Sequence, residues 1–191
     1  MSHPTGLVAV LDANVLYPQW LRDLMLTIAA LGYYQPRWSE LIVDEMRRNV
    51  LRDHPTIEPD RFDAVTIAAL RRAFPDAWTQ VDDALVEQMD NAPEDRHVLA
   101  TAIAAGAQIV VTSNVDDFIT SGLVESGHVT IERPGTFLRT VLDEHPEILD
   151  DALWHLASNR RGVATTADVL DQLGRNETLT TFVNNARAKL L

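Results

Sequence analysis

Short apolar runs alternate with longer stretches of helical spacing over the first two thirds of the chain. Residues 7–11 form a continuous apolar run, which is typical of a buried parallel strand. Similar runs at 108–112 and 128–131 predict two more strands. Between them, apolar residues with a period of three to four predict helices over 21–31, 39–52, 59–73, 79–90 and 93–105. This alternation predicts an α/β fold with a parallel sheet covered by helices.

The pattern changes at Pro134-Gly135, after which only helical spacing is found. The helices predicted there cover 136–144, 146–159, 166–173 and 177–190. We therefore expect an α/β domain over residues 1–133 and an all-helical extension over 134–191. In that extension Arg160 and Arg161 precede Gly162 in an expected turn, where they would contact phosphate or an acidic partner, or simply be solvated.

Composition narrows the class of protein. With 191 residues, 46% of them hydrophobic, the chain can bury a core. No secretory signal and no apolar run of the ~20 residues that span a bilayer is evident, so we expect a cytoplasmic protein without membrane contact. Cysteine is absent, which leaves oxygen and imidazole as the only metal ligands.

The charges exclude several enzyme classes. The net charge of −12 repels nucleic acid. A carboxylate site that binds cations would reverse the charge locally. The acidity of the chain also suits a basic protein partner. Lys189 is the only lysine among 16 basic residues. P-loop enzymes and haloacid-dehalogenase-like phosphatases need a lysine beside the phosphate. The latter would also need an aspartate where Asn14 stands, so both classes are disfavoured.

Acidic and polar residues follow two of the predicted strands. Asp12 comes directly after the first strand, and the second strand runs into Thr112, Asn114 and the pair Asp116-Asp117. Ligands of open α/β sheets bind at the carboxyl edge, where these residues would meet. Alone, Asp12 could equally be a cap of the following turn.

Helical spacing separates two further pairs of acids. Asp95 begins the apolar stripe of its helix, whereas Glu94 does not, and a carboxylate on the core side is costly unless it is paired or binds metal. Glu45 borders the buried face of its helix, whereas Asp44 is expected in solvent. A cluster of such oxygen ligands suits Mg²⁺ or Mn²⁺. Glycoside hydrolysis, the alternative use of carboxylates, needs only two.

Other polar residues have less specific patterns. The six histidines, His97 included, show no metal-ligand spacing and are expected to be surface or packing residues. His97 and Asp95 would lie on different faces of one helix. Arg47, Arg48 and Arg96 are candidates for contacts with an RNA backbone, or else they belong to ordinary solvated helix faces.

Four segments together resemble the PIN-domain nucleases. They are residues 10–16, 38–45, 95–102 and 112–118. The resemblance implies a three-layer α/β/α fold and a Mg²⁺ or Mn²⁺ site that cleaves RNA. By position its catalytic and metal-binding acids would be Asp12, Glu45, Asp95 and Asp117, with Asp116 as the alternative to the last. Asn14, Thr112, Asn114 and Asp116 would orient ligands or substrate.

Small bacterial PIN proteins are commonly VapC-type toxins of type II toxin–antitoxin systems. The resemblance therefore implies an endoribonuclease toxin silenced by a cognate antitoxin protein, and it is compatible with a homodimer. The helical extension makes this chain longer than the usual toxin and is similar to that of a long subset of VapC-like proteins. A PIN-like module that binds RNA or protein without cleavage is the alternative, and the acids at all four positions favour activity.

Overall fold

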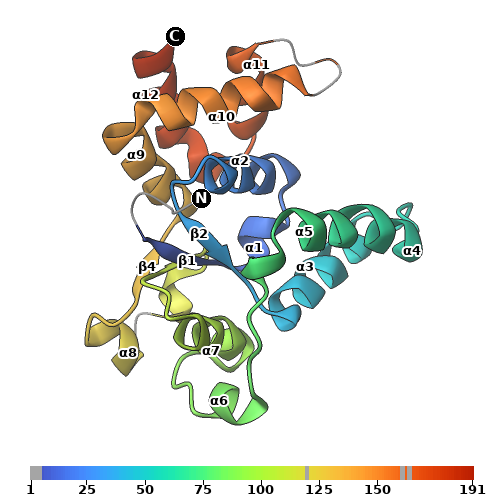
Figure 1. Ribbon diagram of the computed structural model, residues 1–191, viewed down its shortest axis with the longest axis vertical. Helices are drawn as coiled ribbons and strands as arrows, with labels where there is room; N and C mark the ends of the chain where they lie inside the picture. The colour runs from blue at the N-terminus through green and yellow to red at the C-terminus, as the bar shows by residue number, and fades with distance from the viewer. Residues whose placement is uncertain (1–5, 119–120, 160–161, 163–164) are drawn as a thin grey trace.

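A computed structural model of the chain describes residues 6–118, 121–159, 162 and 165–191, so Arg160 and Arg161 lie outside the described residues. Its centre is a parallel sheet with the strand order β2-β1-β3-β4 (Figure 1). The strands are β1 (Val8–Leu11), β2 (Gln35–Arg37), β3 (Ile109–Val111) and β4 (Thr130–Glu132). The predicted α/β class with a helical C-terminal region is confirmed.

The register of the two central strands brings distant parts of the chain together. Val10 pairs with Val110 and Leu11 with Val111, and these side chains are buried. The Asp12 N–H then donates to the Val111 carbonyl at 3.1 Å. The residues that follow β1 and β3 therefore meet at one edge of the sheet, as parallel pairing requires.

Strand β2 is absent from the sequence prediction. Gln35-Pro36-Arg37 contains no apolar run, and proline normally argues against a strand. The strand pairs with β1 at an edge of the sheet, where the missing N–H of Pro36 breaks no ladder. Its pairing depends on its neighbours rather than on its own composition.

Helices cover both faces of the sheet, with α2 and α7 on opposite sides (Figure 1). Ser39 caps α3, since its hydroxyl accepts from the Ile42 N–H, and Gly106 ends α7 with a φ of 61°. The helices before the extension are α1 (Ala13–Leu16), α2 (Gln19–Ala30), α3 (Glu40–Asp53), α4 (Pro59–Phe62), α5 (Ala68–Ala73), α6 (Asp83–Glu87), α7 (Arg96–Ala105) and α8 (Gly122–Glu125).

Two of the predicted helices differ most from the structure, whereas those predicted from 93 and 177 each begin with a 3-10 turn. A π-helical turn, Asp63–Ile67, separates α4 from α5 in the stretch predicted as one helix over 59–73. The helix predicted over 79–90 is only α6. The first residues of the predicted range are not helical, because the Thr79 N–H donates to the Trp38 carbonyl. The helix begins only after Asp82, whose side chain accepts from the Ala84 N–H.

The C-terminal helices share one hydrophobic core with the sheet and its helices. They are α9 (Pro134–Glu144), α10 (Pro146–Ser158), α11 (Thr166–Leu173) and α12 (Thr180–Leu190). Helix α10 packs on α2, where Leu24 and Ile28 are buried, and it contributes Leu149 and Leu153 to the same cluster. In the described part of the chain, no helix is both long and apolar enough to cross a bilayer.

This shared core predicts that the two parts of the chain unfold together. Leu153→Ala in α10 removes a side chain that is 0% exposed and should lower the free energy of unfolding of the whole chain by about 2–5 kcal/mol. Trp154→Ala changes a residue that is 59% exposed and should cost far less. Denaturant unfolding followed by near- and far-UV circular dichroism is the measurement. Two separate transitions, with only one shifted by Leu153→Ala, would show independent units instead.

Candidate active site

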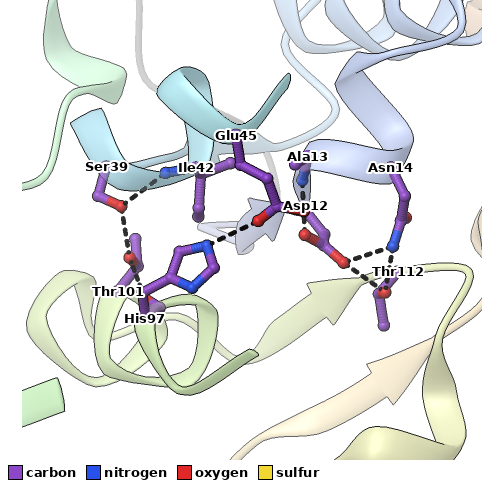
Figure 2. A network of polar contacts seen from close by, with 9 residues as sticks. All are labelled: Asp12, Ala13, Asn14, Ser39, Ile42, Glu45, His97, Thr101 and Thr112. Atoms are coloured by element: carbon purple, nitrogen blue, oxygen red, sulfur yellow. Dashed lines mark hydrogen bonds and ion pairs between the residues drawn. The ribbon is translucent and has the colours of Figure 1, made fainter. Parts of the chain in front are cut away.

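Asp12 is the most deeply buried acid of the predicted set, at 1% exposed. It lies between β1 and α1 and caps that helix, because its Oδ1 accepts from the Ala13 N–H at 2.5 Å. Its Oδ2 accepts from Thr112 Oγ1 and from Asn14 Nδ2, both at 2.6 Å (Figure 2). A buried carboxylate needs such donors, and here they hold it in one orientation.

The donors are themselves cross-linked. Asn14 Nδ2 also reaches Thr112 Oγ1 at 3.0 Å, and Asn14 Oδ1 accepts from the Ser113 N–H at 2.9 Å. Thr112 Oγ1 further accepts from the Asn114 N–H at 3.0 Å. The segment after β1 and the loop after β3 are thus tied together around Asp12. The network fixes the orientation of the Asp12 carboxylate, in addition to its role as the cap of α1.

Glu45 and His97 face each other from α3 and α7 (Figure 2). Glu45 Oε2 lies 3.1 Å from His97 Nε2, and both side chains are partly buried. Asp44 is exposed, in agreement with the helical spacing. The contact holds the Glu45 carboxylate on the side of α3 that faces α7.

Asp95 and Asp117 each lie in a 3-10 turn, Pro93–Asp95 and Val115–Asp117. The two turns adjoin, because the Ala92 N–H donates to the Asp117 carbonyl at 3.2 Å. Asp95 is buried and Asp117 half-buried, whereas Asp116 is exposed. A cavity of about 540 Å³ brings three of the predicted acids together; its lining residues are Leu41, Glu45, Arg48, Glu94, Asp95, His97, Asn114 and Asp117.

Burial and mutual repulsion raise the pKa values of two acids at this edge of the sheet. Burial raises the pKa of Asp12 to about 6, and the charge of Glu45 adds to this despite the hydrogen bond from Thr112. Burial also raises the pKa of Asp95 to about 7, with further contributions from the charges of Asp12, Asp117 and Glu45. Such shifts are characteristic of functional sites.

The donor chemistry fits a divalent cation, although a finished binding geometry is not present. Carboxylate oxygens are what Mg²⁺ and Mn²⁺ prefer, and a cation would offset the repulsion that raises the two pKa values. Within the described residues, no three Asp, Glu or His side chains are gathered closely enough to hold an ion. Binding would therefore have to draw the acids closer together.

His97 is the residue that the sequence analysis did not assign to the site. It was expected on a different face from Asp95 because both were placed on one α-helix. Asp95 instead lies in the 3-10 turn before α7, with φ of −108° and ψ of 3°, so α-helical spacing does not relate the two. No pattern in the sequence signals this change of geometry.

The three predicted RNA-binding arginines have different surroundings. Arg48 lines the cavity. Arg47 is held by both oxygens of Asp63, at 2.6 and 2.9 Å, and does not line it. Arg96 Nε donates to the Asn91 carbonyl at 3.3 Å. Only Arg48 is thus brought beside the acids by the observed packing.

Another cavity, of about 560 Å³, lies at the far end of α3. Tyr17, His54 and Phe62 line it, and Glu58 is the one carboxylate among its described lining residues. A single acid cannot supply the multiple oxygen ligands that a cation needs. This cavity therefore lacks the set of oxygen ligands that the acids at the edge of the sheet offer.

Comparison with known proteins identifies a family. A family model described as "PIN domain" matches residues 8–116. No curated protein and no solved structure is a significant match to the chain. The matched range begins at β1 and ends within the turn after β3, so it includes Asp12, Glu45 and Asp95.

The pKa shifts predict how metal-free stability depends on pH. The pKa of Asp95 is 3.8 in the unfolded reference and about 7 in the folded chain, so its contribution to stability is full below about pH 4 and is lost as the pH rises through 7. Asp95→Asn should therefore raise the melting temperature by a few degrees near neutral pH in chelator, with the gain disappearing toward about pH 4. The matched control is Glu94→Gln, at the exposed neighbour. Thermal denaturation across this range checks it, and a destabilised Asp95→Asn chain at neutral pH would contradict it.

Proposed function

The chain belongs to the PIN-domain family, whose members are generally nucleases, and on this premise we propose that it is a Mg²⁺- or Mn²⁺-dependent endoribonuclease. The observation that carries the proposal is the grouping of acids at the carboxyl edge of β1 and β3. Asp12 and Asp95 have raised pKa values there because they are buried close to other carboxylates. Repulsion among these carboxylates does not stabilise the metal-free fold. A cation site, in contrast, requires carboxylates to be grouped in this way.

Asp12, Glu45, Asp95 and Asp117 are the residues that would hold the cation. When bound, it supplies polarisation of a phosphoryl oxygen and a nucleophile for in-line attack. The chain's own part is to orient the ligands. Three hydrogen bonds fix the carboxylate of Asp12 and leave part of its accepting capacity free, since an ionised carboxylate has about four lone-pair sites.

The polar residues around the acids have supporting roles in this proposal. Asn14 and Thr112 position Asp12, and His97 positions Glu45. The side chain of Asn114 lines the cavity, where it would orient substrate together with Arg48. Asp116, exposed beside Asp117, stays the alternative fourth acid. Loss of such supporting contacts in metal sites typically costs 10–100-fold in activity.

We further propose that the chain is the toxin of a toxin–antitoxin pair, of the VapC type. The resemblance of its four sequence segments to PIN-domain nucleases, whose small bacterial members are commonly such toxins, supports this. A partner that covers the acid cavity would need basic residues, and the net charge of −12 suits such a partner. The alternative is a PIN-like module that binds RNA or protein without cleavage. An RNA-cleavage assay with Mn²⁺ and with chelator separates the two.

Asp12→Asn should abolish RNA cleavage and leave the fold intact. The change removes a ligand charge at nearly constant volume and relieves the repulsion on Asp95. We expect a loss of more than about 100-fold, beyond that of an outer-shell contact. The assay uses the purified full chain with Mg²⁺ or Mn²⁺, and circular dichroism monitors the fold. Cleavage at the wild-type rate would show that the site is assigned wrongly.

The two acidic pairs should respond unequally to substitution. Glu45→Gln should cost much more activity than Asp44→Asn, because Glu45 lines the cavity and Asp44 is exposed. Asp117→Asn should likewise cost more than Asp116→Asn. Initial rates under single-turnover conditions compare all four variants. Equal losses within a pair would count against the assignment of that position.

A further inference from the structure

A small pocket of about 180 Å³ lies where the start of α9 meets the segment that leads into α12. Figure 1 shows the two helices, which pack on each other. The pocket is distinct from the acid cavity, and it contains two guanidinium groups and three threonine side chains. Its lining residues are Arg133, Gly135, Thr136, Arg139, Thr178, Thr181 and Phe182. No carboxylate is among these described lining residues, in contrast to the acid cavity.

Close packing of the extension forms this pocket. Arg133 follows β4 and is the N-cap of α9, and Arg139 lies further along the same helix. Gly135 lets α9 approach the Glu177–Leu179 turn, because a Cβ there would lie only 3.0 Å from the Thr178 carbonyl oxygen. The approach places Thr178 and Thr181 beside the two arginines.

Among the described residues the two arginines lack acidic partners, in contrast to several other arginines of the chain. Arg47, Arg52, Arg71 and Arg187 each form an ion pair with a carboxylate. Across the ranges that the structure describes, Arg133 and Arg139 form none, and both are exposed; the hydroxyls of Thr136 and Thr181 likewise make no hydrogen bond there. Two unneutralised guanidiniums beside free hydroxyl donors are suited to bind a phosphate.

A short chain of hydrogen bonds connects this pocket with the acid site. Arg133 Nη1 donates to the Ser113 carbonyl at 2.8 Å. The Ser113 N–H donates to Asn14 Oδ1 at 2.9 Å, and Asn14 in turn donates to Asp12. Arg133 is therefore attached to the same loop that orients Asp12. Because β4 is parallel to β3 and Val111 pairs with Glu132, Arg133 also lies at the edge of the sheet where the acids meet.

We propose that Arg133 and Arg139, with Thr136 and Thr181, bind a backbone phosphate of the RNA strand beside the one that is cleaved. The inference rests on the proposed ribonuclease function and assigns the C-terminal extension a part in substrate binding. The net charge of −12 and the cluster of acids repel RNA, which is a polyanion. The inference accounts for how the chain would nevertheless bind it. Local cations of the protein would offset that repulsion.

The test is RNA binding by the full-length chain in an Asp12→Asn background, where the RNA is not cleaved. Arg139→Gln is the main variant, since the structure shows no hydrogen bond from this side chain to another described residue. We expect roughly tenfold weaker binding of a single-stranded oligonucleotide, as for loss of a charged hydrogen bond. The slope of log affinity against log salt should shrink by about 0.7 for one phosphate lost. Arg139→Lys should keep most of that slope.

Arg61→Gln is the control, because it removes the same charge from an exposed position on α4, far from α9 (Figure 1). It should leave affinity and salt slope almost unchanged, and melting curves verify that the variants fold alike. Equal affinity and equal salt slope for Arg139→Gln and the background would overturn this inference alone. A background chain that binds no RNA at all would overturn both the inference and the proposed function.

Discussion

The hydrogen bond from Thr112 to Asp12 joins the two strand ends on which the proposed site depends. It exists because β1 and β3 are adjacent, parallel and in register, so that the residues after Leu11 and Val111 meet at one edge. Asn14 completes the arrangement by bonding to Asp12, Thr112 and Ser113 together. A slip in the pairing of these strands would separate the acid from its donors. The buried core of the sheet therefore determines the position of the proposed site.

The grouping of acids at this edge of the sheet has an electrostatic cost. Asp95 is buried within the influence of three other carboxylates, and its pKa rises to about 7 in consequence. The chain tolerates this because a large shared core, extended by α9–α12, stabilises the fold elsewhere. This matches a common relation in proteins, in which a functional site is held in an unfavourable arrangement by the rest of the structure, and it is what the proposed site would require.

Much of this arrangement could be predicted from the sequence. Strands with continuous apolar runs, and the acids that follow them, were predictable because parallel pairing has a fixed geometric consequence. The exposure of Asp44 and the partial burial of Glu45 followed from helical spacing. Strand β2 could not be predicted, since its pairing is imposed by β1 and its composition opposes it. The same holds for the Arg133 and Arg139 pocket, whose parts come together only through the packing of α9 on α12.

The central claim is that these acids hold a divalent cation, and calorimetric titration of Mn²⁺ into the full-length chain tests it most directly. Three forms should be compared: the wild type, Asp12→Asn and Asp44→Asn. The account predicts binding by the wild type, similar affinity for Asp44→Asn, and a loss of at least about tenfold for Asp12→Asn. Absence of binding by the wild type, or one affinity shared by all three, would contradict it.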